Sequence, residues 1–103
     1  MTYDQLETIS KIGDKDKKCF AELREVLERH GALERFGVCL LHDHFDVGDD
    51  EILEEVCDET NRVLTAQPVD RASWEAKPNS RATMWELKEN RALQGCIFEL
   101  NHN

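Results

Sequence analysis

Apolar side chains recur at helical spacing near the N-terminus of the chain. Leu6 and Ile9 share one face of a helix. Thr2 and Gln5 have the spacing of a capping box, and Gly13 suits a helix end. We therefore predict a short first helix that finishes at Gly13.

A second helix is predicted from Asp14 or Asp16 to Gly31. Its inward face carries apolar residues at positions i, i+3 and i+7, namely Phe20, Leu23 and Leu27. One further turn is expected before Gly37. The pattern thus indicates a pair of helices within residues 1–36.

After Gly37, apolar and polar residues alternate. The segment 38–47 is rich in Val, Leu and Phe and is too short between its glycines for a good helix, so we predict a strand. Alternate side chains of a strand share a face, which places His42, His44 and Asp46 on the same side.

The segment 50–66 allows two interpretations. Apolar residues fall at helical spacing behind an aspartate that could cap a helix: Ile52, Leu53, Val56, Cys57, Val63 and Leu64. Against a helix, residues 58–61 have turn chemistry, residues 62–69 include β-favouring Val and Thr, and the strand at 38–47 needs a neighbour for its backbone groups. We favour a hairpin.

The C-terminal part predicts a loop followed by a second hairpin. Residues 70–80 contain turn-forming residues, and we expect Trp74 to anchor this loop against the protein. Alternating patterns predict strands at 81–88 and 91–100. Trp85 is expected in the core.

These elements predict one domain of the α+β class. The chain has 103 residues, which is enough for one modest core and too few for two. Residues 1–36 form its helical part, and residues 37–103 its mainly β part. We expect the N-terminal helical pair to pack on an antiparallel sheet of four or five strands, or on a partly closed barrel.

Composition supports a folded chain, since apolar residues make up 40% of it and charged residues 34%. The first residues resemble no signal peptide, and no stretch is long enough to span a bilayer, so we expect a cytoplasmic protein that does not bind membranes. The cysteines form no CxxC pair, and we expect buried free thiols at Cys19, Cys39, Cys57 and Cys96.

The net charge of −9 is concentrated in one stretch, residues 43–59, which we call the acidic segment. It contains no Lys or Arg and nine carboxylates: Asp43, Asp46, Asp49, Asp50, Glu51, Glu54, Glu55, Asp58 and Glu59. Such a field repels nucleic acid and attracts a basic protein surface or a divalent cation. The simplest alternative is a solvated face that keeps the protein soluble.

The most suggestive local chemistry is the pair His42 and His44. Residues at i and i+2 of a strand lie about 7 Å apart at Cα, which lets two imidazoles reach one metal ion. Asp46 shares their face, and Cys96 or His102 on the last predicted strand would complete the site. Zinc, iron, nickel or copper would suit these ligands. The competing interpretation is one hydrogen-bonded histidine and one that faces solvent.

Two known metal motifs match this region only in part. A cupin metal strand has His-x-His followed by an acid, which His42, His44 and Asp49 resemble, but the second cupin motif is missing. An EF-hand alignment fails because Phe45 and Val47 stand where oxygen ligands are required. A calcium site of another geometry, or a partner-binding site, would use Asp46, Asp49, Asp50, Glu51 and Glu54.

Three functions remain open from the sequence. The first is a binding or accessory protein that presents the acidic segment to a basic protein partner. The second is a metal-binding protein, or a small metal-dependent enzyme, that uses His42 and His44. The third is a calcium-binding protein without EF-hand geometry. No catalytic residue is identified, because no spacing brings a nucleophile and a base together.

Overall fold

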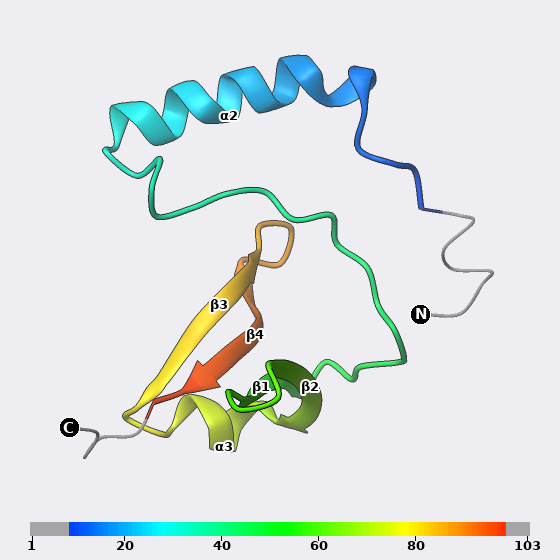
Figure 1. Ribbon diagram of the computed structural model, residues 1–103, viewed down its shortest axis with the longest axis vertical. Helices are drawn as coiled ribbons and strands as arrows, with labels where there is room; N and C mark the ends of the chain where they lie inside the picture. Colours follow the sequence, from blue (N-terminus) through cyan, green and yellow to red (C-terminus); the bar gives the residue numbers. More distant parts are fainter. Residues whose placement is uncertain (1–8, 99–103) are drawn as a thin grey trace. The chain divides into compact units, whose positions relative to one another are not determined.

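A computed structural model describes residues 9–98 of the chain. The chain divides into two compact units, Met1–Phe45 and Asp46–Asn103, which we describe separately (Figure 1). The hypothesis of a single domain stays a prediction. In chain order the elements are η1 (Asp14–Asp16), α2 (Lys17–Arg29), β1 (Glu51–Asp58), β2 (Val63–Asp70), α3 (Arg71–Glu75), β3 (Ser80–Glu86) and β4 (Arg91–Ile97).

The first unit is built around α2, the second of the two helices that the sequence predicts. Gly31, at φ 65°, ends it in a left-handed conformation that glycine adopts without strain. The Gly31 N–H bonds the Glu28 carbonyl at 3.0 Å, and the Ala32 N–H bonds the Leu27 carbonyl at 2.8 Å. This pair of bonds is a Schellman motif, which satisfies carbonyls that the helix end would leave open.

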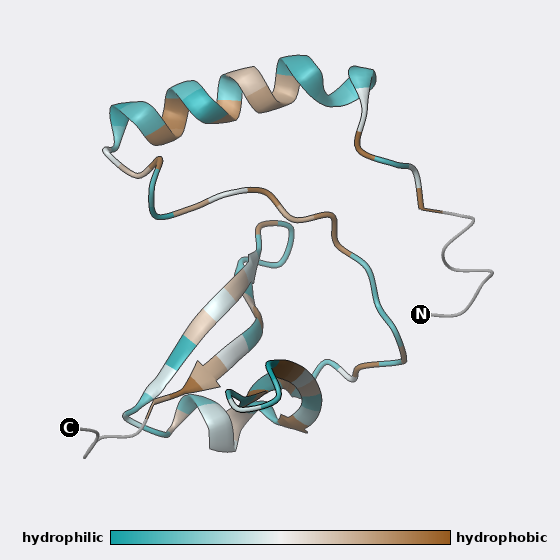
Figure 2. Cartoon of the chain, in the orientation of Figure 1, coloured by the Kyte–Doolittle hydropathy of each residue, from teal (hydrophilic) through white to brown (hydrophobic). Residues whose placement is uncertain are grey.

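The other predicted helix, over residues 2–13, lies mostly outside the described residues. Its described part, residues 9–13, is not helical, so a helical pair is not confirmed. Apolar residues recur along α2 and along the segment after it (Figure 2). Within residues 9–98, no helix combines the length and the hydrophobicity that crossing a bilayer requires.

The prediction of a strand at 38–47 is wrong, because residues 36–48 form no ladder with any described strand. Alternation makes a strand only where a neighbour bonds its backbone groups. Both sides of β1 are occupied, by β2 and by β4. The open edges resist further pairing, since β2 contains Pro68 and β3 has two register shifts.

The second unit is a four-stranded open sheet in the order β2-β1-β4-β3. The interpretation of 50–66 as a hairpin is confirmed, with β1 and β2 paired from Glu51↔Asp70 to Asp58↔Val63. The C-terminal hairpin of β3 and β4 is confirmed as well. However, β1 and β4 run parallel, so the sheet is mixed rather than antiparallel, and it does not close into a barrel. The α+β class holds.

The predicted loop at 70–80 contains the short helix α3, which packs on the sheet (Figure 1). Asp70 caps this helix by accepting bonds from the N–H and hydroxyl of Ser73 at 2.9 and 2.8 Å. These two bonds hold the pKa of Asp70 below its ordinary value, the backbone bond contributing most.

Trp74 carries the core of the second unit. Its side chain is 3% exposed and packs with Ile52 and Ala92, against which Val69 and Ile97 also lie. The expectation that Trp74 anchors this segment is therefore met. Trp85 was expected in the core but is 52% exposed. It lies on the edge strand β3, where its indole N–H bonds the side chain of Asn90 at 3.0 Å.

Arg71 ties the two parallel strands together where both begin. Its guanidinium donates to the carbonyl of Ala92 at 2.7 Å and to that of Glu51 at 2.9 Å. Its side chain is 14% exposed and also pairs with Glu75 at 3.5 Å. Because two parallel strands cannot be joined by a short turn, this clamp holds together two strands that the chain connects only through β2, α3 and β3.

The prediction of four buried thiols is wrong for three of them. Cys19, Cys39 and Cys57 are exposed, and Cys96 is half-buried. All four are free thiols. Apolar neighbours in the sequence do not bury a cysteine, because its own side chain can point outward from a helix or strand, as at Cys19 and Cys57, or lie on an irregular segment, as at Cys39.

Candidate functional site

The acidic segment spans the boundary between the two units. Asp43 belongs to the first unit, and the other eight carboxylates belong to the second. Those eight lie in the segment 46–50 before β1, along β1, and in the turn after it. The hairpin fold places β1 next to β2, which contains no Lys or Arg, so the neighbouring strand supplies no cation.

One carboxylate of the acidic segment has an ion-pair partner among residues 9–98. Asp49 lies 3.6 Å from the guanidinium of Arg91, which also donates to the Asp49 carbonyl at 3.2 Å. Arg91 is shared, because its Nε lies 3.7 Å from Glu86. A pair this long and this exposed neutralises little of the local field.

Two further carboxylates are held by local hydrogen bonds. Glu51 accepts the N–H of Gly48 at 2.8 Å. Asp58 accepts bonds from the side-chain amide of Asn61 at 2.8 Å and from its backbone N–H at 3.1 Å. The side-chain bond, followed by the backbone bond, keeps the pKa of Asp58 below its ordinary value, so this carboxyl group stays ionised.

Glu55 makes a polar cluster on the sheet that the sequence did not reveal. It accepts the thiol of Cys96 at 3.2 Å and the hydroxyl of Thr83. The parallel register pairs Glu55 with Cys96 across β1 and β4. Burial, followed by the bond from the thiol to Glu55, raises the pKa of Cys96 to about 11. Cys96 is thus a protonated thiol engaged with Glu55.

The remaining side chains of the segment make no hydrogen bond or ion pair within the described part of the chain. Asp43, Asp46, Asp50 and Glu59 are exposed, and Glu54 is half-buried. These five carboxylates are the part of the acidic segment that could contact another molecule.

His42 and His44 converge, although they do so on an irregular segment rather than on a strand. Their Nε2 atoms lie 3.1 Å apart, and the ring centres lie 4.9 Å apart with the planes at 78°. The Nδ1 atom of His42 lies 2.8 Å from the carbonyl of Leu40. Since a carbonyl can only accept, Nδ1 of His42 carries a proton, and in the neutral ring its Nε2 presents a lone pair to His44.

The other predicted metal ligands do not join this pair into a larger cluster. Asp46 opens the second unit, Cys96 is bonded to Glu55 on the sheet, and His102 lies outside the described residues. Among residues 9–98, no group of three or more His, Cys, Asp or Glu side chains is arranged to hold a metal ion. The predicted calcium ligands form no such group within these residues either: Asp46, Asp49, Asp50, Glu51 and Glu54. Calcium binding stays a prediction.

Comparison with known proteins adds no relative. The chain matches no protein-family model, and neither the curated proteins nor the solved structures include a significant match.

Proposed function

We propose that this protein is a binding or accessory protein that presents its acidic segment to a basic surface of another protein. The observation that carries the proposal is the imbalance between charge and counter-charge. The segment has nine carboxylates and no base, and within residues 9–98 a single ion pair reaches it. An uncompensated field of one sign selects partners of the opposite sign.

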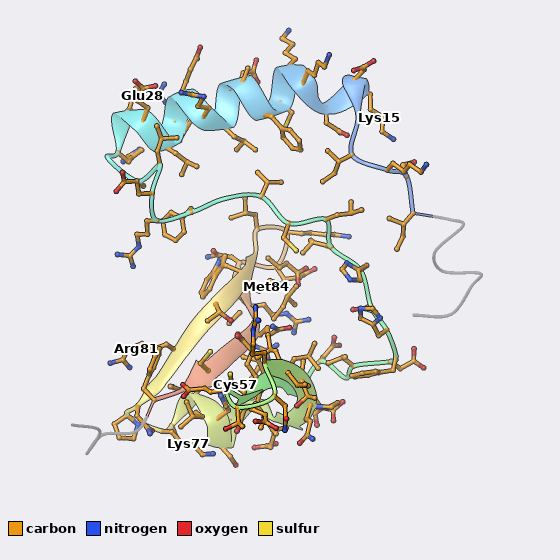
Figure 3. All side chains as sticks on the ribbon, in the orientation of Figure 1. Lys15, Glu28, Cys57, Lys77, Arg81 and Met84 are labelled. Carbon is orange, nitrogen blue, oxygen red and sulfur yellow. The ribbon has the colours of Figure 1, made fainter. Side chains whose placement is uncertain are left out.

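The distribution of charge within the second unit supports the same proposal. Residues 46–70 contain nine carboxylates and one base, Arg62. Residues 71–98 contain five bases and three acids. Two of these bases, Lys77 and Arg81, lie where α3 leads into β3 (Figure 3). Charge is therefore unevenly distributed in this unit, with the negative charge on residues 46–70. This field would orient a basic partner as it approaches.

The size of the effect follows from the exposure of these groups. Each exposed ion pair contributes about 0.2–1 kcal/mol, so four such contacts change the affinity by about fourfold to several hundredfold. Charge of this kind mainly speeds association and rejects acidic partners. It is screened by salt over about 8–10 Å.

The experiment compares two variants with the same change in net charge. One replaces four carboxylates of the acidic segment that lack a partner in the described chain, Asp46→Asn, Asp50→Asn, Glu54→Gln and Glu59→Gln. The control replaces four exposed acids elsewhere, Glu22→Gln, Glu25→Gln, Glu34→Gln and Glu89→Gln. Binding to a fluorescent oligolysine peptide is measured by anisotropy. The proposal expects a loss of affinity of about fourfold or more in the first variant alone.

Equal losses in the two variants would refute the proposal. They would mean that net charge alone attracts the peptide, and that the acidic segment is a solvated face without a binding role.

A further inference from the structure

We propose that His42 and His44 form a two-imidazole site for a borderline divalent transition metal ion, with both Nε2 atoms as ligands. The site goes beyond the proposed binding function and does not depend on it. It lies wholly within the first unit.

The spacing of the two rings matches that of a shared ion. Two nitrogens on a tetrahedral metal, each about 2.05 Å from it, lie about 3.3 Å apart, and the ring centres behind them lie about 5.2 Å apart. The corresponding distances here are 3.1 Å between Nε2 atoms and 4.9 Å between ring centres. The two nitrogens would therefore separate by about 0.2 Å, and each ring would turn so that its lone pair points at the ion rather than at the other nitrogen.

The carbonyl of Leu40 orients the first ligand. Histidine ligands usually donate their second ring N–H to a carbonyl or carboxylate, which fixes the tautomer and the ring. His42 makes this bond at 2.8 Å. The carbonyl is available because residues 36–48 form no ladder, so the absence of the predicted strand is what builds the site.

Without metal, the Nε2 atoms of His42 and His44 make a hydrogen bond to each other. Because the Nε2 of His42 is the acceptor, the Nε2 of His44 carries the proton between the rings. An ion bound to both nitrogens would lie about 1.2 Å off the line that joins them, and His44 would move its ring proton from Nε2 to Nδ1 through solvent. Such a hydrogen bond holds the two Nε2 atoms at nearly the liganded spacing before the ion arrives, which lowers the ordering cost of binding.

The ligand type selects the ion. Imidazole suits copper, nickel and zinc rather than calcium or magnesium, and affinity for such a site is highest for Cu²⁺. Asp43, between the two histidines, is exposed and adds negative charge that attracts a cation. Among residues 9–98 no third ligand joins the pair, so water would complete the coordination of the ion there.

The test uses the full chain purified without a histidine tag and titrated with Cu²⁺ and Zn²⁺ by calorimetry. His42→Ala and His44→Ala are expected to weaken binding at least tenfold. His30→Ala is the matched control, because His30 is an exposed histidine at the end of α2. It should bind like the unchanged protein. Circular dichroism of each variant checks that α2 and the sheet are intact.

Two further readouts keep the proposal falsifiable. Nitrogen-15 NMR of the imidazoles should show His42 protonated at Nδ1 before metal is added, and Cu²⁺ should give an electron paramagnetic resonance signal of two nitrogen ligands. Unchanged affinity in folded His42→Ala and His44→Ala would overturn the proposal. A loss of metal affinity in His102→Ala, with none in His42→Ala or His44→Ala, would also overturn the proposal. Binding of oligolysine by His42→Ala should be normal, which separates this site from the proposed partner surface.

Discussion

Replacing Gly95 by alanine tests the packing of the second unit. A Cβ at this position would lie 2.5 Å from the Cη2 atom of Trp74 and 2.6 Å from the carbonyl oxygen of Arg81. Ordinary contacts begin at 3.4 Å, and both obstacles are rigid, since one is a buried indole and the other is backbone. The new methyl group therefore has to push apart the core and the β3–β4 pair.

Overpacking of this severity costs about 3 kcal/mol. For a small domain, the free energy of unfolding falls by about 1–1.5 kcal/mol per molar urea, so the unfolding midpoint should fall by roughly 2–3 M. The transition is followed by the fluorescence of Trp74, which is buried in the folded state.

Gly48→Ala is the matched control within the same unit. Its Cβ would meet the flexible carboxylates of Asp50 and Glu51 at 2.9 and 3.2 Å, and these can swing away. The expected cost is below about 1 kcal/mol. If Gly95→Ala unfolds at the same urea concentration as Gly48→Ala, the indole of Trp74 does not lie against residue 95, and the described core is wrong.

Three other predictions follow from single contacts. Arg71→Met should destabilise the second unit by about 2–4 kcal/mol in urea unfolding, because two bonds from a charged donor to part-buried carbonyls are lost; an unchanged midpoint would exclude the clamp. Cys96 should react with iodoacetamide more slowly at neutral pH than the exposed Cys57. Glu55→Gln should raise the reaction rate of Cys96 only modestly, since burial remains the main cause of the raised pKa of Cys96. Equal rates for both cysteines would contradict this. Asp70 has a lowered pKa in the folded state, so its cap stabilises the protein above its ordinary pKa of 3.8, and this stabilisation is lost as the pH falls through the lower folded value. In Asp70→Asn, the stability of the protein should therefore fall less steeply with pH in this acid range. An unchanged dependence of stability on pH would refute this role of the cap.

The elements that the sequence predicted correctly are those set by local chemistry. The second helix has its apolar spacing and a terminal glycine, and Gly31 does adopt the left-handed conformation. The hairpin at 51–70 follows from turn residues at 58–61, where Asp58 bonds Asn61. In these cases a few neighbouring residues determine the structure.

The elements that it missed depend on distant partners. Residues 38–47 alternate like a strand, but no described strand offers them a ladder. The parallel pairing of β1 with β4 joins segments about forty residues apart, and no local pattern encodes it. The short helix α3 did have a readable signal, since Asp70 and Ser73 have the spacing of an N-cap.

The candidate sites divide in the same way. The acidic segment can be read directly from the sequence, because charge needs no geometry. The convergence of His42 and His44 was anticipated, but from a strand face that does not form; the bond to Leu40 brings the rings together instead. The bond between Cys96 and Glu55 could not be anticipated, because it requires the parallel register.

The most direct test of the proposed function is the salt dependence of oligolysine binding, measured by anisotropy for the unchanged protein and for the variant with four neutralised carboxylates in the acidic segment. For the unchanged protein, affinity should be highest at low salt and should fall steadily as salt is added. The variant should bind weakly at every salt concentration and show a shallower dependence. Parallel curves of equal affinity for the two proteins would contradict a binding role for the acidic segment.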